Sequence, residues 1–222
     1  MKKTLVFAII ALFALNCAAF SQKTKTKKNA PKKTTATLKR IETPRINPSI
    51  KGKNQVERPL YEITVSQNGV EMGKIMLETY TDLAPLHAKN FDSLVSVKFY
   101  DGTAFHRVIP GFMIQGGDPN SREGDRATWG MGSPDQTRVP AEFSATLKHK
   151  RGILSAARTP DPNSATSQFF ICHADIPHLD GQYSIYGEVV EGMDVVDKIA
   201  NAPRDARDNP NDKISMMIKR VK

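Results

Sequence analysis

The segment FHRVIPGFMIQGGD, 14 residues from Phe105 to Asp118, combines one arginine with several large apolar side chains. On a strand, successive side chains point to opposite faces. This alternation predicts two groups, with Phe105, Arg107 and Ile109 on one face and His106 and Val108 on the other. We therefore expect a shallow apolar surface with a fixed cation beside it. Such a surface suits an uncharged ligand that carries a carbonyl group, and it suits a phosphate or a sugar poorly.

The second half of the segment adds an amide to this surface. Pro110-Gly111 predicts a turn. Beyond the turn, Met113 and Gln115 are two residues apart and are expected to share a face. Gly116-Gly117-Asp118 is not followed by a lysine–serine pair or by a helix pattern, which argues against a phosphate-binding loop. The histidines and carboxylate pairs of the chain lack metal-ligand spacing, so we expect neither a metal nor a cofactor.

This segment resembles the signature of the cyclophilins, the cyclosporin-binding family of peptidyl-prolyl cis-trans isomerases. Two further blocks resemble the family: SQFFI at residues 167–171, and Leu179-Asp180-Gly181 followed by YGEVV at residues 186–190. The similarity extends from about Arg58 to the C-terminus. It implies catalysis of rotation about X-Pro peptide bonds, a process whose barrier of roughly 18–20 kcal/mol arises from amide resonance. Such a reaction needs no nucleophile, metal or proton transfer.

The resemblance also implies roles for individual residues. Arg107 matches the catalytic donor, which faces the proline nitrogen as that atom regains its lone pair in the twisted transition state. A guanidinium suits this task because it stays charged and has a rigid fork of donors. Gln115 matches an amide that orients the arginine and contacts substrate, and Ala157 matches a residue that binds substrate backbone. The residues that match the proline pocket are Phe112, Met113, Phe170 and Leu179.

Four further positions belong to the predicted groove or its rim. Arg158 stands where many relatives have asparagine. His178 and Tyr183 stand where cyclosporin-sensitive relatives have tryptophan and histidine, so the resemblance implies weaker cyclosporin binding. His106 faces away from Arg107 in the predicted strand, and both a structural position and a rim position are open to it.

The fold class follows from many short strands and two distant helices. Strands are predicted at residues 61–65, 73–77, 105–109, 113–115, 153–156, 169–172, 185–190 and 214–218, and helices at 84–98 and 192–200. This pattern favours an antiparallel barrel. The resemblance sharpens it to a mainly β fold, a closed eight-stranded antiparallel barrel capped by two α-helices. Leu86 is expected in the apolar stripe of the first helix. Trp129, in the loop 119–140, is either a packing anchor or part of the ligand rim.

The N-terminal part of the chain predicts export. Two lysines precede an unbroken apolar run of 11 residues, 5–15, which is too short to span a membrane and predicts a signal peptide over residues 1–21. Cleavage after Ser21 is the main interpretation, and a lipoprotein acylated at Cys17 is the alternative. The segment RTPDPNSAT at 158–166 resembles bacterial members of the family. We therefore expect an exported protein of the periplasm or envelope.

Residues 22–58 predict a basic, disordered arm. They carry 12 Lys or Arg against two Glu, a net charge of +10, and few large apolar residues, so they bury too little surface to offset the entropy lost on ordering. Residues 59–222, the predicted isomerase domain, carry 18 basic and 21 acidic residues, a net charge of −3. The basic composition therefore does not indicate a nucleic-acid-binding domain. The arm is either a tether or a weak contact to anionic surfaces.

The main hypothesis is an exported, bacterial-type cyclophilin that isomerises X-Pro bonds in proline-containing polypeptides and assists their folding. We expect a monomer that has no cofactor and no specific nucleic-acid partner. A competing hypothesis is a proline-peptide binding module or chaperone with little turnover. A third, an adaptor driven by the basic arm, rests only on charge. The intact set of Arg107, Phe112, Met113 and Gln115 favours the enzyme.

Overall fold

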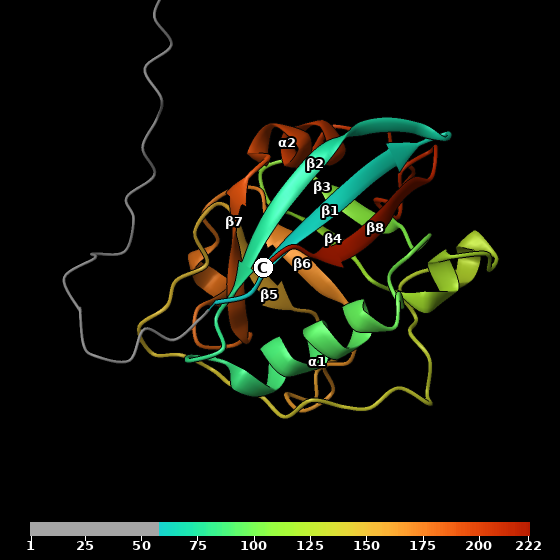
Figure 1. Ribbon diagram of the computed structural model, residues 1–222. Helices are drawn as coiled ribbons and strands as arrows, with labels where there is room; N and C mark the ends of the chain where they lie inside the picture. Colours follow the sequence, from blue (N-terminus) through green and yellow to red (C-terminus); the bar gives the residue numbers. More distant parts are fainter. Residues whose placement is uncertain (1–57) are drawn as a thin grey trace, which may run out of the picture. The chain divides into compact units, whose positions relative to one another are not determined.

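The computed structural model of the chain describes residues 58–222 (Figure 1). The predicted signal peptide, Cys17 and the arm up to residue 57 lie outside the described residues. Within residues 58–222, no helix is long and apolar enough to cross a membrane.

Alternating burial defines the first two strands, as the sequence pattern predicts. In β1 (Leu60–Gln67), every second side chain from Tyr61 to Val65 is fully buried. β1 turns into β2 (Val70–Thr79) through Asn68 and Gly69, whose φ angles are 52° and 78°. Positive φ at both central residues is the geometry of a type I′ hairpin turn, whose twist matches that of the two strands.

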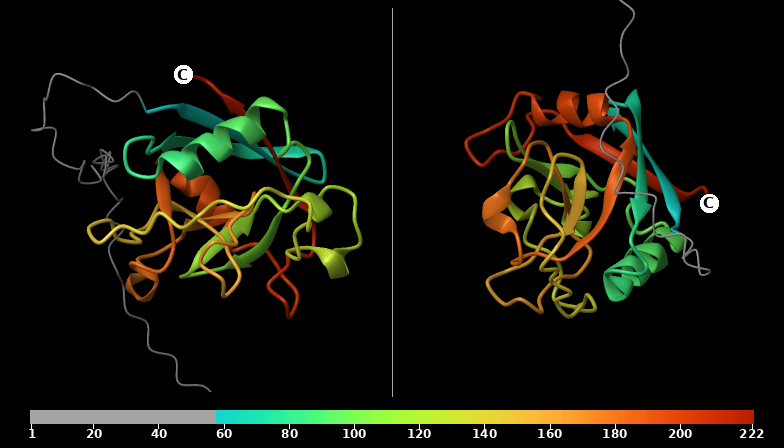
Figure 2. Two further views of the ribbon diagram at one scale, coloured as in Figure 1. Left: turned by 90° about the horizontal axis from the view of Figure 1, so that it is seen from below. Right: turned by 90° about the vertical axis from the view of Figure 1, so that its left-hand side faces the viewer.

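All eight strands form one antiparallel sheet in the order β3-β4-β6-β5-β7-β2-β1-β8. The other strands are β3 (Phe105–Ile109), β4 (Met113–Gly116), β5 (Ile153–Ala156), β6 (Phe169–Cys172), β7 (Ile185–Glu191) and β8 (Ile214–Arg220). Ala104, just before β3, forms only an isolated bridge with Ser215 of β8. The expected closed barrel is therefore nearly closed, and Figure 2 shows the strands curling around its core.

Two α-helices lie at opposite ends of the barrel in Figure 1. α1 (Pro85–Ser96) packs on β7 and β8, and α2 (Met193–Ala200) packs on β2, β3 and β4. The first turn of α1 is capped by a distant residue, since the N–H groups of Leu86 and His87 donate to Glu142 at 3.0 and 2.9 Å. The expectation that Leu86 is buried is wrong. Its side chain is 47% exposed, because His87 and Ala88 occupy the side of the turn that faces the barrel.

Two apolar clusters lie on opposite faces of the central strands. Ile114 and Ile171 belong to the barrel interior, whereas their neighbours Met113 and Phe170 belong to a second cluster on the outer face. The strand alternation therefore supplies a core and a separate apolar floor from the same two strands. The partly buried side chains packed against this outer cluster include Phe112, Ala157, Leu179 and Tyr183.

The loop that follows β4 contains two short 3₁₀ helices, η1 (Pro119–Ser121) and η2 (Arg126–Thr128). Trp129 is a packing anchor within it. The indole N–H donates to the Gly124 carbonyl at 2.9 Å, and the ring lies beneath the cationic groups of Arg126 and Lys213. Trp129 does not line either pocket of the candidate site described below.

Candidate active site

A β-bulge separates Arg107 from the barrel interior. Phe105 pairs with Gly116 and Arg107 pairs with Gln115, so β3 advances two residues while β4 advances one. As a result Phe105 is fully buried in the core, whereas Arg107 is exposed on the outer face. The expectation that Phe105 and Arg107 share a face is wrong, because the extra residue, His106, interrupts the simple alternation.

The sheet register places cation, amide and aromatic ring in one row. Gln115 on β4 pairs with Arg107 on one side and with Phe170 of β6 on the other, and Phe170 pairs with Ser155 of β5. Residues paired across antiparallel strands point to the same face. Met113, two residues before Gln115, shares this face as predicted and is packed in the outer apolar cluster.

The predicted groove residues meet at one pocket of about 110 Å³. It is lined by Arg107, Phe112, Met113, Gln115, Ala157, Arg158, Phe170, Leu179 and Tyr183. Met113 and Phe170 form the floor, since their side chains are only 2% and 4% exposed. Within residues 58–222, Arg107 makes neither a hydrogen bond nor an ion pair. Its guanidinium donors are therefore available to a bound molecule.

Gln168 holds the amide of Gln115, a role that the sequence analysis did not assign. Nε2 of Gln115 donates to Oε1 of Gln168 at 3.0 Å, and Nε2 of Gln168 donates to the Gly130 carbonyl at 3.1 Å. This chain of amides fixes the orientation of Gln115 and ties the pocket to the glycine-containing loop. Gln168 directly precedes Phe169-Phe170 in the block SQFFI, which resembles the family, and this place in the sequence could have indicated its role.

Arg158 and Tyr183 form one side of the pocket. The Arg158 guanidinium lies 4.4 Å from the centre of the Tyr183 ring, and its Nε and Nη2 donate to the Gln182 carbonyl at 3.0 and 2.8 Å. This arrangement fixes both side chains. Arg158 therefore contributes a cation in a fixed position, and Tyr183 forms an aromatic wall of the pocket.

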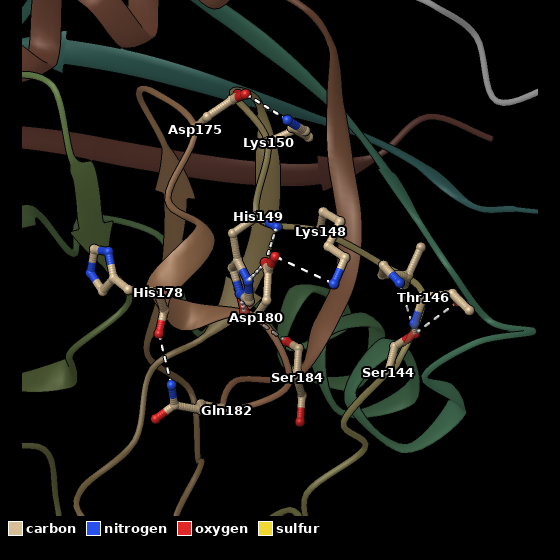
Figure 3. Close-up of polar contacts among 12 residues, drawn as sticks. Ser144, Thr146, Lys148, His149, Lys150, Asp175, His178, Asp180, Gln182 and Ser184 are labelled. Atoms are coloured by element: carbon tan, nitrogen blue, oxygen red, sulfur yellow. Dashed lines mark hydrogen bonds and ion pairs between the residues drawn. The ribbon is translucent and has the colours of Figure 1, made fainter.

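His178 lies at the rim and not in the lining of the pocket. It belongs to the 3₁₀ helix η3 (Pro177–Leu179), and its ring stacks on that of Phe112. The carbonyl of His178 accepts from Nε2 of Gln182 at 2.7 Å, which fastens the two ends of this loop (Figure 3). His178 therefore supports the outer side of Phe112.

His149 supports the pocket from behind, although the sequence analysis gave it no role. Its ring stacks on Phe170 with centroids 6.0 Å apart and meets Tyr183 edge-on at 6.4 Å. Nδ1 lies 3.1 Å from Oδ1 of Asp180 (Figure 3), and Nε2 lies 3.2 Å from Oγ of Ser155. Burial lowers the pKa of His149, against the opposing effect of Asp180, so the ring favours its neutral form.

A structural position and a rim position were both open to His106, and the side chain occupies the structural one. Its side chain is 4% exposed and lies next to the loop at Gly130, not in the pocket. Burial is the main cause that lowers the pKa of His106, and the nearby Asp118 opposes it. No cluster of His, Cys, Asp or Glu in the described part of the chain is arranged to hold a metal ion.

A second pocket of about 370 Å³ continues the groove. It shares Gln115, Ala157 and Arg158 with the first pocket and extends along residues 130–138. Arg138 adds a second cation, and no carboxylate lines it. A peptide segment seated in the first pocket has room to continue along the second.

The eight-stranded barrel with two helices and an outer groove is the architecture that the comparisons with known proteins address. Residues 61–222 match the family "Cyclophilin type peptidyl-prolyl cis-trans isomerase/CLD". The chain belongs to this family, and its enzyme class is peptidyl-prolyl cis-trans isomerase.

Known proteins of this class are similar in sequence and structure. A peptidyl-prolyl cis-trans isomerase of Acinetobacter baylyi is 46% identical over 145 residues, which cover 63% of this chain and 73% of that protein. A probable isomerase of Brucella abortus is 46% identical over 153 residues, with 66% and 78% covered. A crystal structure of a Cryptosporidium parvum cyclophilin-type isomerase has a TM-score of 0.66 and 31% identity, and the match covers 75% of this chain and 99% of that one. The mainly β cyclophilin-like fold is confirmed.

Proposed function

We propose that this protein isomerises X-Pro bonds in exported polypeptides and that Arg107 supplies the donor in the transition state. The observation that carries the proposal is the guanidinium of Arg107, which has no hydrogen-bond or ion-pair partner within residues 58–222 and lies at the edge of a pocket with an apolar floor. A second structure of the Cryptosporidium parvum protein, with a TM-score of 0.64, was solved in the presence of the dipeptide Ala-Pro. This supports a proline-containing peptide as the ligand of the groove.

The proposed mechanism uses the change in the proline nitrogen during rotation. In the planar amide its lone pair is delocalised into the carbonyl group, and in the twisted transition state the lone pair returns to nitrogen. A donor that faces this nitrogen stabilises the transition state more than either planar isomer, which lowers the barrier in both directions. Arg107 suits this role because its donors are rigid, permanently charged and not engaged by other described residues.

The apolar pocket is proposed to hold one side of the rotating bond, the proline ring, in place. The proline ring is proposed to rest on Met113 and Phe170, between Phe112 and Leu179, where it loses contact with water. With the ring held, the carbonyl of the preceding residue turns about the C–N bond. Gln115, whose amide is oriented by Gln168, is placed to bind that substrate backbone.

The proposed setting is the periplasm or envelope of a bacterium. It is supported by the signal-peptide pattern of residues 1–21, by the basic composition of residues 22–58, and by the similarity to bacterial isomerases. A proline-peptide binding module with little turnover is the competing function. The guanidinium of Arg107, which no other residue of the described part of the chain engages, favours the enzyme over this module, because binding alone does not require a donor beside the pocket.

Magnetisation-exchange NMR on a proline tetrapeptide separates the two functions. Uncatalysed exchange between the cis and trans isomers takes on the order of 10–100 s. The proposal predicts that a small molar fraction of the protein makes the exchange fast enough to be seen directly. If the peptide binds but its exchange is not accelerated, the protein is a binding module and the proposed function is wrong.

A further inference from the structure

Three arginines line the groove, and their charges meet no carboxylate in its lining. Arg107 and Arg158 line the first pocket, and Arg138 and Arg158 line the second. No aspartate or glutamate of the described residues lines either pocket. Residues 59–222 carry 18 basic and 21 acidic residues, so the excess of cations along the groove is local and does not follow from the composition of the domain.

Arg158 is a cation in a fixed position without an anionic partner in the described part of the chain. Its Nε and Nη2 donate to the Gln182 carbonyl at 3.0 and 2.8 Å, and its Nη1 donates to the carbonyls of Thr159 and Pro160 at 2.8 and 3.4 Å. These acceptors are neutral main-chain groups. The side chain is therefore held in place while its positive charge stays uncompensated, and a second Nη2 hydrogen remains for a ligand.

Arg138 has a weak anionic partner. Its Nη1 lies 3.5 Å from Oδ2 of Asp161, and the two side chains are 69% and 50% exposed. An ion pair this exposed contributes little to stability, so a carboxylate of a bound peptide can compete for Arg138 at small cost. Asp161 itself does not line the second pocket.

Gln115 relates the second pocket to a part of the substrate. Gln115 lines both pockets, and the proposed mechanism uses its amide to bind the substrate backbone before the proline. A peptide that continues past Gln115 therefore places the preceding residues beside Arg138 and Arg158. An extended chain advances about 3.3 Å per residue, so the side chains concerned belong to the first two residues before the proline.

We propose that the second pocket, through Arg138 and Arg158, selects substrates with an acidic side chain at one of the two positions before the proline. A glutamate is ionised at neutral pH, and it supplies the compensating carboxylate that the lining of the groove lacks. A lysine at the same position meets two like charges and is disfavoured. This inference rests on the proposed function and adds a substrate class to it, namely acidic segments that precede proline.

Three peptide series test this preference. The first two, acetyl-Xaa-Ala-Pro-Phe-amide and acetyl-Ala-Xaa-Pro-Phe-amide, vary the positions before the proline, with Xaa as Glu, Gln or Lys. The third, acetyl-Ala-Ala-Pro-Phe-Xaa-amide, varies a position after it. In one of the first two series we expect kcat/KM for Glu to exceed that for Gln by about threefold, and that for Lys to lie about threefold below it. The third series should show no such order, and the preference should weaken in about 1 M salt, where charges are screened over roughly 3 Å.

Charge-changing variants assign the preference to the two arginines. The readout is the ratio of kcat/KM for the Glu peptide to that for the Gln peptide on the same protein, so a general change in activity cancels. Arg158→Gln and Arg138→Gln should each lower this ratio, and the double variant should bring it to about one. Arg158→Lys keeps the charge and should keep a ratio above that of Arg158→Gln.

Asp161→Asn tests the same account in the opposite direction. The asparagine oxygen can still accept from the N–H of Asn163, as Oδ1 of Asp161 does at 2.9 Å, but the competing charge beside Arg138 is removed. The ratio should therefore rise, by up to about twofold. Arg204→Gln, which changes an exposed arginine that lines neither pocket, is the control and should leave the ratio unchanged.

Equal turnover of the Glu, Gln and Lys peptides would overturn the inference. The same preference in the third series, or a preference that survives the double variant, would also overturn it, because either result assigns the effect to the field of the whole domain. In each of these cases, acceleration of the Gln peptides leaves the proposed function intact. No acceleration of any peptide would instead contradict the proposed function.

Discussion

The rings of Phe112 and His178 lie nearly parallel, with centroids 5.9 Å apart and an angle of 16° between their planes. Phe112 lines the pocket that is proposed to hold proline, and the exposed His178 stacks on Phe112 at the rim. An imidazole offers less apolar surface than an indole. The rim therefore provides little contact to a large apolar macrocycle. The floor of the pocket does not depend on which ring stands at position 178.

His178→Trp is expected to strengthen inhibition by cyclosporin. The larger ring adds apolar contact and an indole N–H at the rim, for which we expect about a tenfold decrease in the inhibition constant. Turnover of a short peptide should change by less than about twofold, because His178 does not line the pocket that is proposed to hold the proline ring. Inhibition titrations of both proteins test this. Equally tight inhibition of the unmodified protein would show that His178 does not limit macrocycle binding.

Gln168→Ala is expected to lower activity without removing any group that lines the proline pocket. The change frees the amide of Gln115 and breaks the link to Gly130, at 3.0 and 3.1 Å respectively. Loss of about 1 kcal/mol in positioning corresponds to a fall of about fivefold in kcat/KM. Steady-state kinetics of the variant, with its fold verified by NMR, provide the measurement. An unchanged kcat/KM would mean that Gln115 needs no support.

Buried histidines should make the domain less stable in acid. Burial lowers the pKa of His87, His106 and His149 in the folded protein. The unfolded chain therefore takes up these protons first, as the pH falls through about 6.5, and stability decreases until the lower folded pKa values are reached. Urea unfolding followed by Trp129 fluorescence should give a lower midpoint at about pH 5 than at about pH 7.5.

A variant assigns this pH dependence to particular residues. His106→Asn removes one titrating group, so the midpoint should change less between the two pH values, whatever the overall stability of the variant. Asp180 and Asp197 have lowered pKa values and lose their stabilising effect only in stronger acid, as the pH falls below the ordinary range of a carboxyl group. A midpoint that rises on acidification would contradict this account.

The basic arm should be separable from catalysis, with Arg58 kept in the domain. Arg58, which the sequence analysis placed at the end of the arm, bonds to Glu78 and Asp82 at 3.1 Å and lies over the Tyr80 ring at 4.4 Å. A protein truncated to begin at Arg58 should retain full peptide turnover. It should lose sedimentation with anionic vesicles, which in the longer protein should weaken with salt because charges are screened over roughly 8 Å at physiological ionic strength. Equal sedimentation of both proteins would leave the arm as a tether.

The strands could be predicted because local patterns determine them. The alternation in β1 and the Asn68-Gly69 turn each depend on neighbouring residues, so no distant contact was needed to place the first hairpin. The bulge at His106 could not be predicted in this way. Its sequence alternates like that of an ordinary strand, and only pairing with β4 shows the extra residue.

The pocket residues could be predicted from family resemblance, whereas their supports could not. Gln168 is 38 residues from Gly130, and His173 is 62 residues from Gly111, yet each pair is hydrogen-bonded. Periodicity carries no information about such pairs. Trp129 illustrates the same limit, since its partner Lys213 lies on a segment far along the chain.

The most direct test of the central claim is the turnover of Arg107→Ala. Because Arg107 makes no hydrogen bond or ion pair within residues 58–222, its removal should leave the fold intact, as the NMR spectrum would verify. Loss of a preorganised donor predicts a decrease of about 100-fold or more in kcat/KM. Arg204→Ala, which removes an exposed arginine that lines neither pocket, is the matched control and should keep full activity. A folded Arg107→Ala protein with the same turnover as this control would contradict the mechanism.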